Sequence, residues 1–64
     1  MKHVIVNHAG KRAFNFTATN KGDIQFQWID YVDNEDYSSV GVSNVKEVVK
    51  TERLEKGVTK VFYN

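Results

Sequence analysis

The sequence has 64 residues, no cysteine and no proline, and its formal net charge at pH 7 is +1. Residues 1–64 are enough for one small domain with a thin core, which leaves little room for an enclosed small-molecule pocket or a complete enzyme active site. The lack of cysteine excludes disulfides and thiolate chemistry. With no long apolar run and no signal peptide, we expect a cytoplasmic protein that does not cross a membrane.

The first half of the chain predicts a three-stranded antiparallel meander over residues 2–8, 12–19 and 23–32. Apolar and polar residues alternate in these segments, as they do in half-buried strands. Three-residue loops at 9–11 and 20–22 would pair Val6 with Phe14 and Phe16 with Phe26, which keeps the apolar side chains together. The predicted core face carries Val4, Val6, Phe14, Phe16, Ala18, Ile24, Phe26 and Trp28.

The C-terminal third has two interpretations, after a predicted loop at 33–39. A turn at 55–57 predicts a hairpin of strands 45–54 and 58–63, with Leu54 opposite Val58 and Thr51 opposite Val61. The alternative is an α+β fold with a helix at about 44–55 packed on the sheet. The hairpin is favoured because Leu54 would lie on the opposite side of that helix from Val48. We therefore expect an all-β fold, as a five-stranded antiparallel sheet or a small barrel.

No residue pattern in the sequence predicts a catalytic, cofactor or metal site. His3 and His8 are five residues apart on a predicted strand, so they point to opposite faces and cannot act as a pair. A calcium loop starting at Asp33 fails, because Tyr37 and Ser38 occupy the positions where an oxygen ligand and a glycine are required. We expect no enzyme activity, no cofactor and no bound metal.

Four aromatic residues on the predicted core face, Phe14, Phe16, Phe26 and Trp28, have two interpretations. Exposed aromatic rings with nearby lysines form the stacking platforms of single-strand nucleic-acid-binding domains. A domain of this size has few other residues from which to build a core, so we favour the core interpretation. A small nucleic-acid-binding domain remains the alternative function, disfavoured by the near-neutral net charge.

The middle of the chain is acidic and predicts a partner-binding site at Tyr31, Asp33, Glu35, Asp36 and Tyr37. Tyrosine is enriched at interface hot spots, and complementary charge accelerates association. The sequence therefore predicts a non-enzymatic protein-binding module, such as an inhibitor, an adaptor or a small assembly subunit, whose partner has a basic surface. Open sheet edges also predict a homodimer. Compact domains of this kind are frequent in phages and mobile elements, so an accessory protein is expected.

Overall fold

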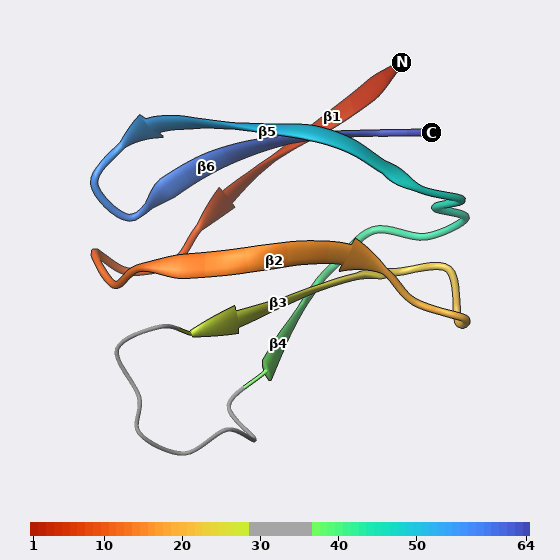
Figure 1. Cartoon of the computed structure of the whole chain (residues 1–64), viewed down its shortest axis with the longest axis horizontal. Helices are drawn as coiled ribbons and strands as arrows, with labels where there is room; N and C mark the ends of the chain where they lie inside the picture. Colours follow the sequence, from red (N-terminus) through yellow and green to blue (C-terminus); the bar gives the residue numbers. More distant parts are fainter. Residues whose placement is uncertain (29–36) are drawn as a thin grey trace.

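The computed structural model describes residues 1–28 and 37–64, and this part of the chain is all-β with no helix (Figure 1). The strands, in chain order, are β1 (Lys2–Asn7), β2 (Ala13–Ala18), β3 (Ile24–Trp28), β4 (Tyr37–Val40), β5 (Val48–Glu55) and β6 (Val58–Tyr63). The all-β prediction is confirmed. The alternative helix at 44–55 is wrong, because residues 48–55 form a strand whose pairing with β6 satisfies their backbone.

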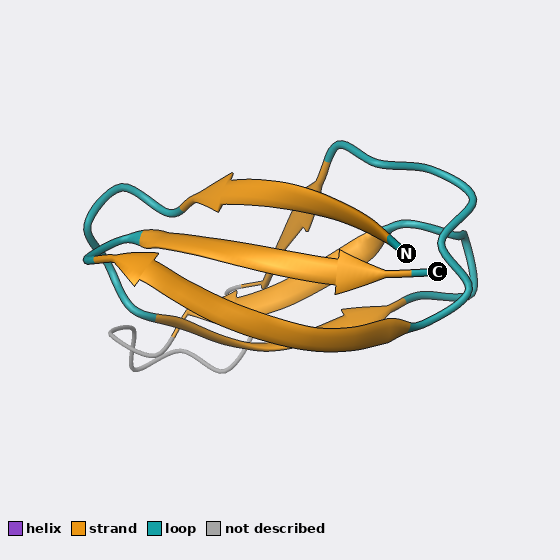
Figure 2. Ribbon diagram, turned by 90° about the horizontal axis from the view of Figure 1, so that it is seen from above, coloured by secondary structure: helices purple, strands orange, loops and turns teal. Residues whose placement is uncertain are grey.

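The strands form two three-stranded antiparallel sheets, in the orders β1-β6-β5 and β2-β3-β4. Figures 1 and 2 show the two sheets as two layers, with the termini close together. The prediction of one five-stranded sheet or small barrel is therefore replaced by two sheets, and the described strands do not close into a barrel. β5 and β2 lie side by side at the front of Figure 1, but no ladder joins them.

The predicted hairpin between the first two strands is wrong. β1 pairs with β6 along its whole length, with Val4 opposite Val61 and Val6 opposite Thr59. The chain leaves β1 through Ala9 and Gly10, whose φ angles are 55° and 74°. This left-handed backbone turns the chain away from its own sheet and into the other one. The long-range partner β6 supplies a six-residue ladder with no irregularity.

A β-bulge changes the register of the predicted β2–β3 hairpin. Ala18 lies opposite Ile24 as predicted, but the register shifts between Phe14 and Thr17. Asn15 lies in this segment with a φ of 61°, a conformation that asparagine tolerates better than most residues. Phe14 is consequently opposite Gln27 instead of Trp28 and is 41% exposed. One extra residue in a strand exchanges the faces of the residues beyond it.

The C-terminal hairpin follows its predicted register in the middle and departs from it at the turn. Thr51 lies opposite Val61 as predicted, but Glu55 replaces Leu54 opposite Val58. Leu54 falls in a bulge and is 52% exposed. The predicted loop is also wrong over 37–39, where the chain forms most of β4 and pairs with β3. Residues 33–36 lie outside the described part of the chain.

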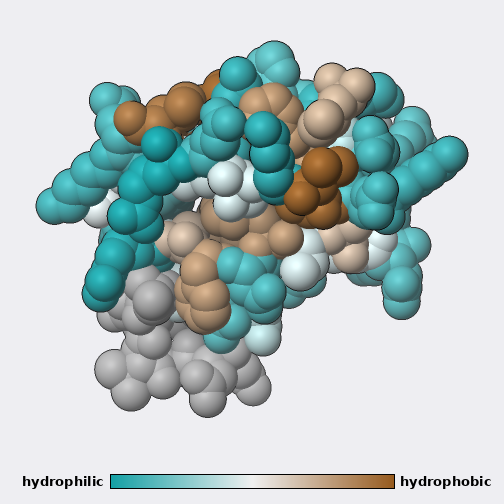
Figure 3. Space-filling view, turned by 45° about the horizontal axis from the view of Figure 1, so that its top comes forward, coloured by the Kyte–Doolittle hydropathy of each residue, from teal (hydrophilic) through white to brown (hydrophobic). Residues whose placement is uncertain are grey.

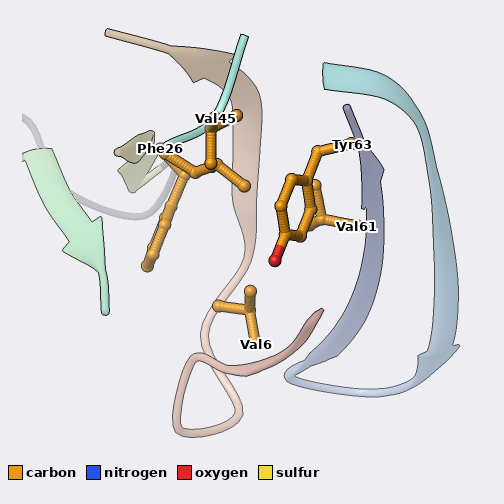
Figure 4. Packing of buried hydrophobic residues seen from close by; sticks show 6 residues of the cluster. Val6, Phe26, Val45, Val61 and Tyr63 are labelled. Carbon is orange, nitrogen blue, oxygen red and sulfur yellow. The ribbon is translucent and has the colours of Figure 1, made fainter. Parts of the chain in front are cut away.

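The core lies between the two sheets, where side chains from both layers meet (Figure 4). Its buried apolar members are Val6, Ile24, Phe26, Val45, Val61 and Tyr63. Seven of the eight residues predicted for the core face are buried there or packed against it, and Phe14 is the exception. The Val45 amide donates to the Gly22 carbonyl at 2.8 Å, which closes one end of the core.

Candidate functional site

The predicted partner-binding residues are only partly placed by the structure. Tyr37, the first residue of β4, lies opposite Gln27 and is 51% exposed. This position leaves its ring available for contact on the outer face of the sheet. The other four predicted residues, Tyr31, Asp33, Glu35 and Asp36, lie outside the described residues, so their role stays a prediction.

The two histidines are separated, as the sequence predicts. His3 is exposed on β1, whereas His8 is 2% exposed and sits between the sheets. The Nδ1 atom of His8 contacts the Lys11 carbonyl, which can only accept a hydrogen bond. Nδ1 therefore carries the proton, and Nε2 accepts from the Thr59 hydroxyl at 2.9 Å. Both ring nitrogens are occupied by the protein, so His8 has a structural role.

Three of the four predicted platform aromatics belong to the core. Phe26 is 4% exposed, Phe16 stacks on it at 5.2 Å, and Trp28 meets its edge at 5.0 Å between centroids. The Trp28 indole N–H also donates to the Ser38 hydroxyl at 2.7 Å. Phe26 is buried and the other two rings are partly buried against it, which agrees with the core interpretation. Phe14 alone turns outward.

An open groove of about 560 Å³ lies between β2 and β5, where the two sheets separate. Its walls hold the exposed apolar side chains of Phe14 and Val49, which are 41% and 44% exposed. Figure 3 shows this side of the molecule, with apolar atoms in brown and tan at the centre and polar side chains in teal around them. The full lining is Ala13, Phe14, Asn15, Phe16, Val48, Val49, Lys50, Thr51, Arg53 and Thr59.

The lining of the groove contains two basic residues, Lys50 and Arg53, and no acidic residue. The Lys50 ammonium is held elsewhere, 3.5 Å from a Glu52 carboxylate oxygen and 4.8 Å from the centroid of the Phe62 ring. Arg53 is exposed and makes no ion pair with residues 1–28 or 37–64. Arg53 is therefore the cation that the groove offers to a ligand.

The backbone of the groove also has unused hydrogen-bonding capacity. Among the described strands, β2 pairs only with β3 and β5 only with β6, so the other edge of each strand faces the groove. Backbone N–H and C=O groups on such an edge need water or another chain as their partner. Bulges fall between Val48 and Lys50 and between Arg53 and Glu55. The uninterrupted part of the β5 edge is therefore Lys50–Arg53.

A smaller polar hollow of about 350 Å³ lies at the β2–β3 turn, lined by residues such as Thr19, Lys21 and Asp23. The Thr19 hydroxyl donates to the Asp23 carboxylate, so the polar groups of this hollow already serve the turn. No cluster of His, Asp or Glu among the described residues is suited to hold a metal ion. The described part of the chain also has no helix with the length and hydrophobicity of a membrane span.

Sequence reasoning missed the groove because the contact between β2 and β5 joins segments far apart in the chain. One available signal was overlooked. The predicted pairing of Thr51 with Val61 places Thr51 and Arg53 on the core side of the hairpin. Polar residues on that side indicate an edge strand whose inner face is open. No comparable signal existed for Phe14, whose exposure depends on the bulge near Asn15.

Comparison with known proteins gives no relative for this chain: no protein-family model, no curated protein and no solved structure matches it. Its function must therefore be argued from the groove and the surfaces described above.

Proposed function

We propose that this chain is a non-enzymatic protein-binding module, such as an inhibitor, an adaptor or a small assembly subunit. Its binding site is the groove between β2 and β5, and the ligand is an extended segment of a partner protein with acidic and apolar side chains. The observation that supports this proposal is an open groove between two strand edges that pair with no other described strand, with exposed apolar side chains and a cation in its lining.

The mode of binding follows from the chemistry of the groove. An extended segment adds to a free strand edge through backbone hydrogen bonds, while its alternate side chains enter the neighbouring pockets. The regular part of β5, Lys50–Arg53, sets the length of this pairing. Phe14 and Val49 accept apolar side chains, because both are exposed on the groove wall. The Arg53 guanidinium group binds a carboxylate, because its forked N–H donors match the two carboxylate oxygens.

The partner predicted here differs in charge from the one that the acidic segment predicts. The groove selects an acidic ligand, whereas Asp33, Glu35 and Asp36 would select a basic one. Charge-changing substitutions made in the groove alone, or in the acidic segment alone, can therefore show which of the two sites binds the partner. The groove is the proposed site because it joins exposed apolar side chains, a cation and strand edges in one place, and the acidic segment is the competing site.

Selection of binding peptides from a short random-peptide display library tests the proposal. We expect the wild-type protein to enrich peptides that alternate acidic and apolar residues. Arg53→Glu should weaken their binding by about tenfold, or 1.4 kcal/mol, because it places like charges together. The matched control is Lys56→Glu, which makes the same charge change at an exposed residue in the β5–β6 turn. This control should bind as the wild type does.

Backbone amide shifts on peptide titration then locate the contact. The proposal requires the largest shifts around Phe14, Val49 and Arg53, on the two walls of the groove. Enrichment of basic peptides, or equal weakening by Arg53→Glu and Lys56→Glu, would contradict a site in this groove. Circular dichroism of each variant shows that weakened binding does not result from unfolding.

A further inference from the structure

β1 is the longest uninterrupted edge in the described part of the molecule. Each sheet has two edge strands, and these are β1 and β5 in one and β2 and β4 in the other. β2 and β5 carry register shifts, and β4 has only four residues. β1 runs from Lys2 to Asn7 in uninterrupted register with β6 and has no other partner among the strands of residues 1–28 and 37–64. Figure 2 shows β1, which starts at the N mark, along the outer margin of its sheet.

Of the devices that protect a strand edge, β1 carries one lysine, Lys2, at its first position. Natural edges are blunted by bulges, proline or charged residues that point inward. β1 has neither bulge nor proline. Of its inward valines, Val6 belongs to the buried core and Val4 packs against it. Ile5, on the opposite face, is 49% exposed. An edge of this kind is suited to pairing with another strand.

The sequence of β1 is complementary to itself in one antiparallel register. A two-fold axis through Ile5 places Ile5 opposite Ile5 of the second copy and Val4 opposite Val6 of the second copy. Opposite residues in an antiparallel pair share a face, so the exposed isoleucines cover each other and the inner valines form a continuous row. His3 lies opposite Asn7 of the second copy, and no like charges are juxtaposed within the strand.

The neighbouring registers are worse for identifiable reasons. A slip of one residue places Ile5 opposite Val4 of the second copy and joins an outer face to an inner face. A slip of two residues places Lys2 opposite the buried Val6. A slip of two residues in the other direction places the exposed Ile5 opposite Asn7. The register centred on Ile5 is thus the one that matches the faces, pairs the two isoleucines and keeps Lys2 away from the inner valines.

We propose that the protein forms a two-fold symmetric homodimer through antiparallel pairing of β1 with β1 of a second copy. The pairing joins the two β1-β6-β5 sheets into one continuous six-stranded sheet, by the self-complementary contact typical of two-fold dimers. The β2–β5 groove of each copy lies at another edge of the fold. The dimer therefore leaves both grooves open and does not depend on the proposed function.

Sedimentation velocity of the intact chain over a wide concentration range tests this dimer. We expect a concentration-dependent dimer for the wild type and a monomer for Ile5→Lys, because that change places two ammonium groups opposite each other. The matched control is Leu54→Lys, the same kind of change at a residue that is 52% exposed on another strand. Leu54→Lys should sediment as the wild type does.

Hydrogen exchange of the wild type is a second test. Because it uses no substitution, its result cannot be confused with the unfolding of a variant. The proposal predicts that amides of β1 gain protection as the protein concentration rises, while amides of β4 do not. A wild type that stays monomeric at millimolar concentration would overturn the proposal. So would a dimer that Ile5→Lys leaves intact, or one whose concentration-dependent protection appears on β4 or β5.

Discussion

His8 connects the two sheets at one end of the core. Its backbone N–H donates to the Gly57 carbonyl at 2.7 Å, and its ring binds Thr59, so it is anchored to the β1-β6-β5 sheet. The same ring lies 6.4 Å from the centroid of Phe26 and 6.3 Å from that of Trp28, in the other sheet. A buried polar ring with both nitrogens satisfied fixes one packing of the layers.

Replacing this side chain should therefore be costly. We expect His8→Ala to lower the free energy of unfolding by about 2–4 kcal/mol, because it leaves a cavity and a buried Thr59 hydroxyl without its partner. His3→Ala, at an exposed residue, should change stability by less than about 0.5 kcal/mol. Urea unfolding of both variants measures the difference. Equal losses of stability would contradict the structural role of His8.

Gly57 is required by a close approach of two turns. Its φ is 79°, and a Cβ at this position would overlap the backbone of Gly10 in the loop after β1. Gly10 has a φ of 74°, but a Cβ added there would point into open space, and Gly41 has room for a Cβ and no left-handed backbone. A comparison of substitutions at the three glycines therefore distinguishes the effect of steric overlap from that of backbone strain.

Alanine substitution at each glycine tests this distinction. We expect Gly57→Ala to be the most destabilising, Gly10→Ala to cost about 1–2 kcal/mol from the left-handed backbone alone, and Gly41→Ala to change stability by less than about 0.5 kcal/mol. Thermal unfolding ranks the three variants. A Gly57→Ala protein as stable as Gly10→Ala would show that the two turns do not meet closely.

At the level of elements, the local sequence pattern predicted where the strands lie better than which strands pair with each other. Alternation in the sequence identified β1, β2 and β3, because side-chain period depends only on the strand itself, and the turn at 55–57 identified the hairpin of β5 and β6. Loop length also gave the Ala18–Ile24 and Thr51–Val61 pairs of the two local hairpins. The pairing of β1 with β6 could not be predicted, since it brings together opposite ends of the chain.

The bulges explain why the candidate site was harder to predict than the core. The alternation of side chains along a strand fixes the face of each residue, whichever strand is its partner. The buried positions of Val6, Ile24 and Phe26 therefore follow from the sequence pattern. The outward position of Phe14 depends on one extra residue in β2, and Val49 lies at a similar irregularity in β5. Alternation alone carries no information about such insertions. The two exposed apolar residues of the groove, Phe14 and Val49, both lie at such irregularities.

At the scale of the whole molecule, the single tryptophan reports whether the aromatic residues serve as a nucleic-acid platform. Trp28 packs against Phe26 and donates to Ser38 from within the fold. We expect a blue-shifted emission spectrum that does not change when oligothymidine is added. A saturable quenching or shift by the oligonucleotide would revive the single-strand binding function. Free tryptophan amide supplies the control for inner-filter effects.

The proposed function of the whole molecule is to bind a partner protein through the β2–β5 groove. Affinity capture from a lysate of the source cells tests it most directly, with nuclease treatment and three baits: wild type, Arg53→Glu and Lys56→Glu. We expect the wild type and Lys56→Glu to capture a discrete protein whose recovery is unaffected by nuclease, and Arg53→Glu to lose it. Recovery that is unaffected by Arg53→Glu, or that disappears with nuclease, would contradict it. In the former case, loss of the protein on combined reversal of Asp33, Glu35 and Asp36 to lysine would assign binding to the acidic segment instead.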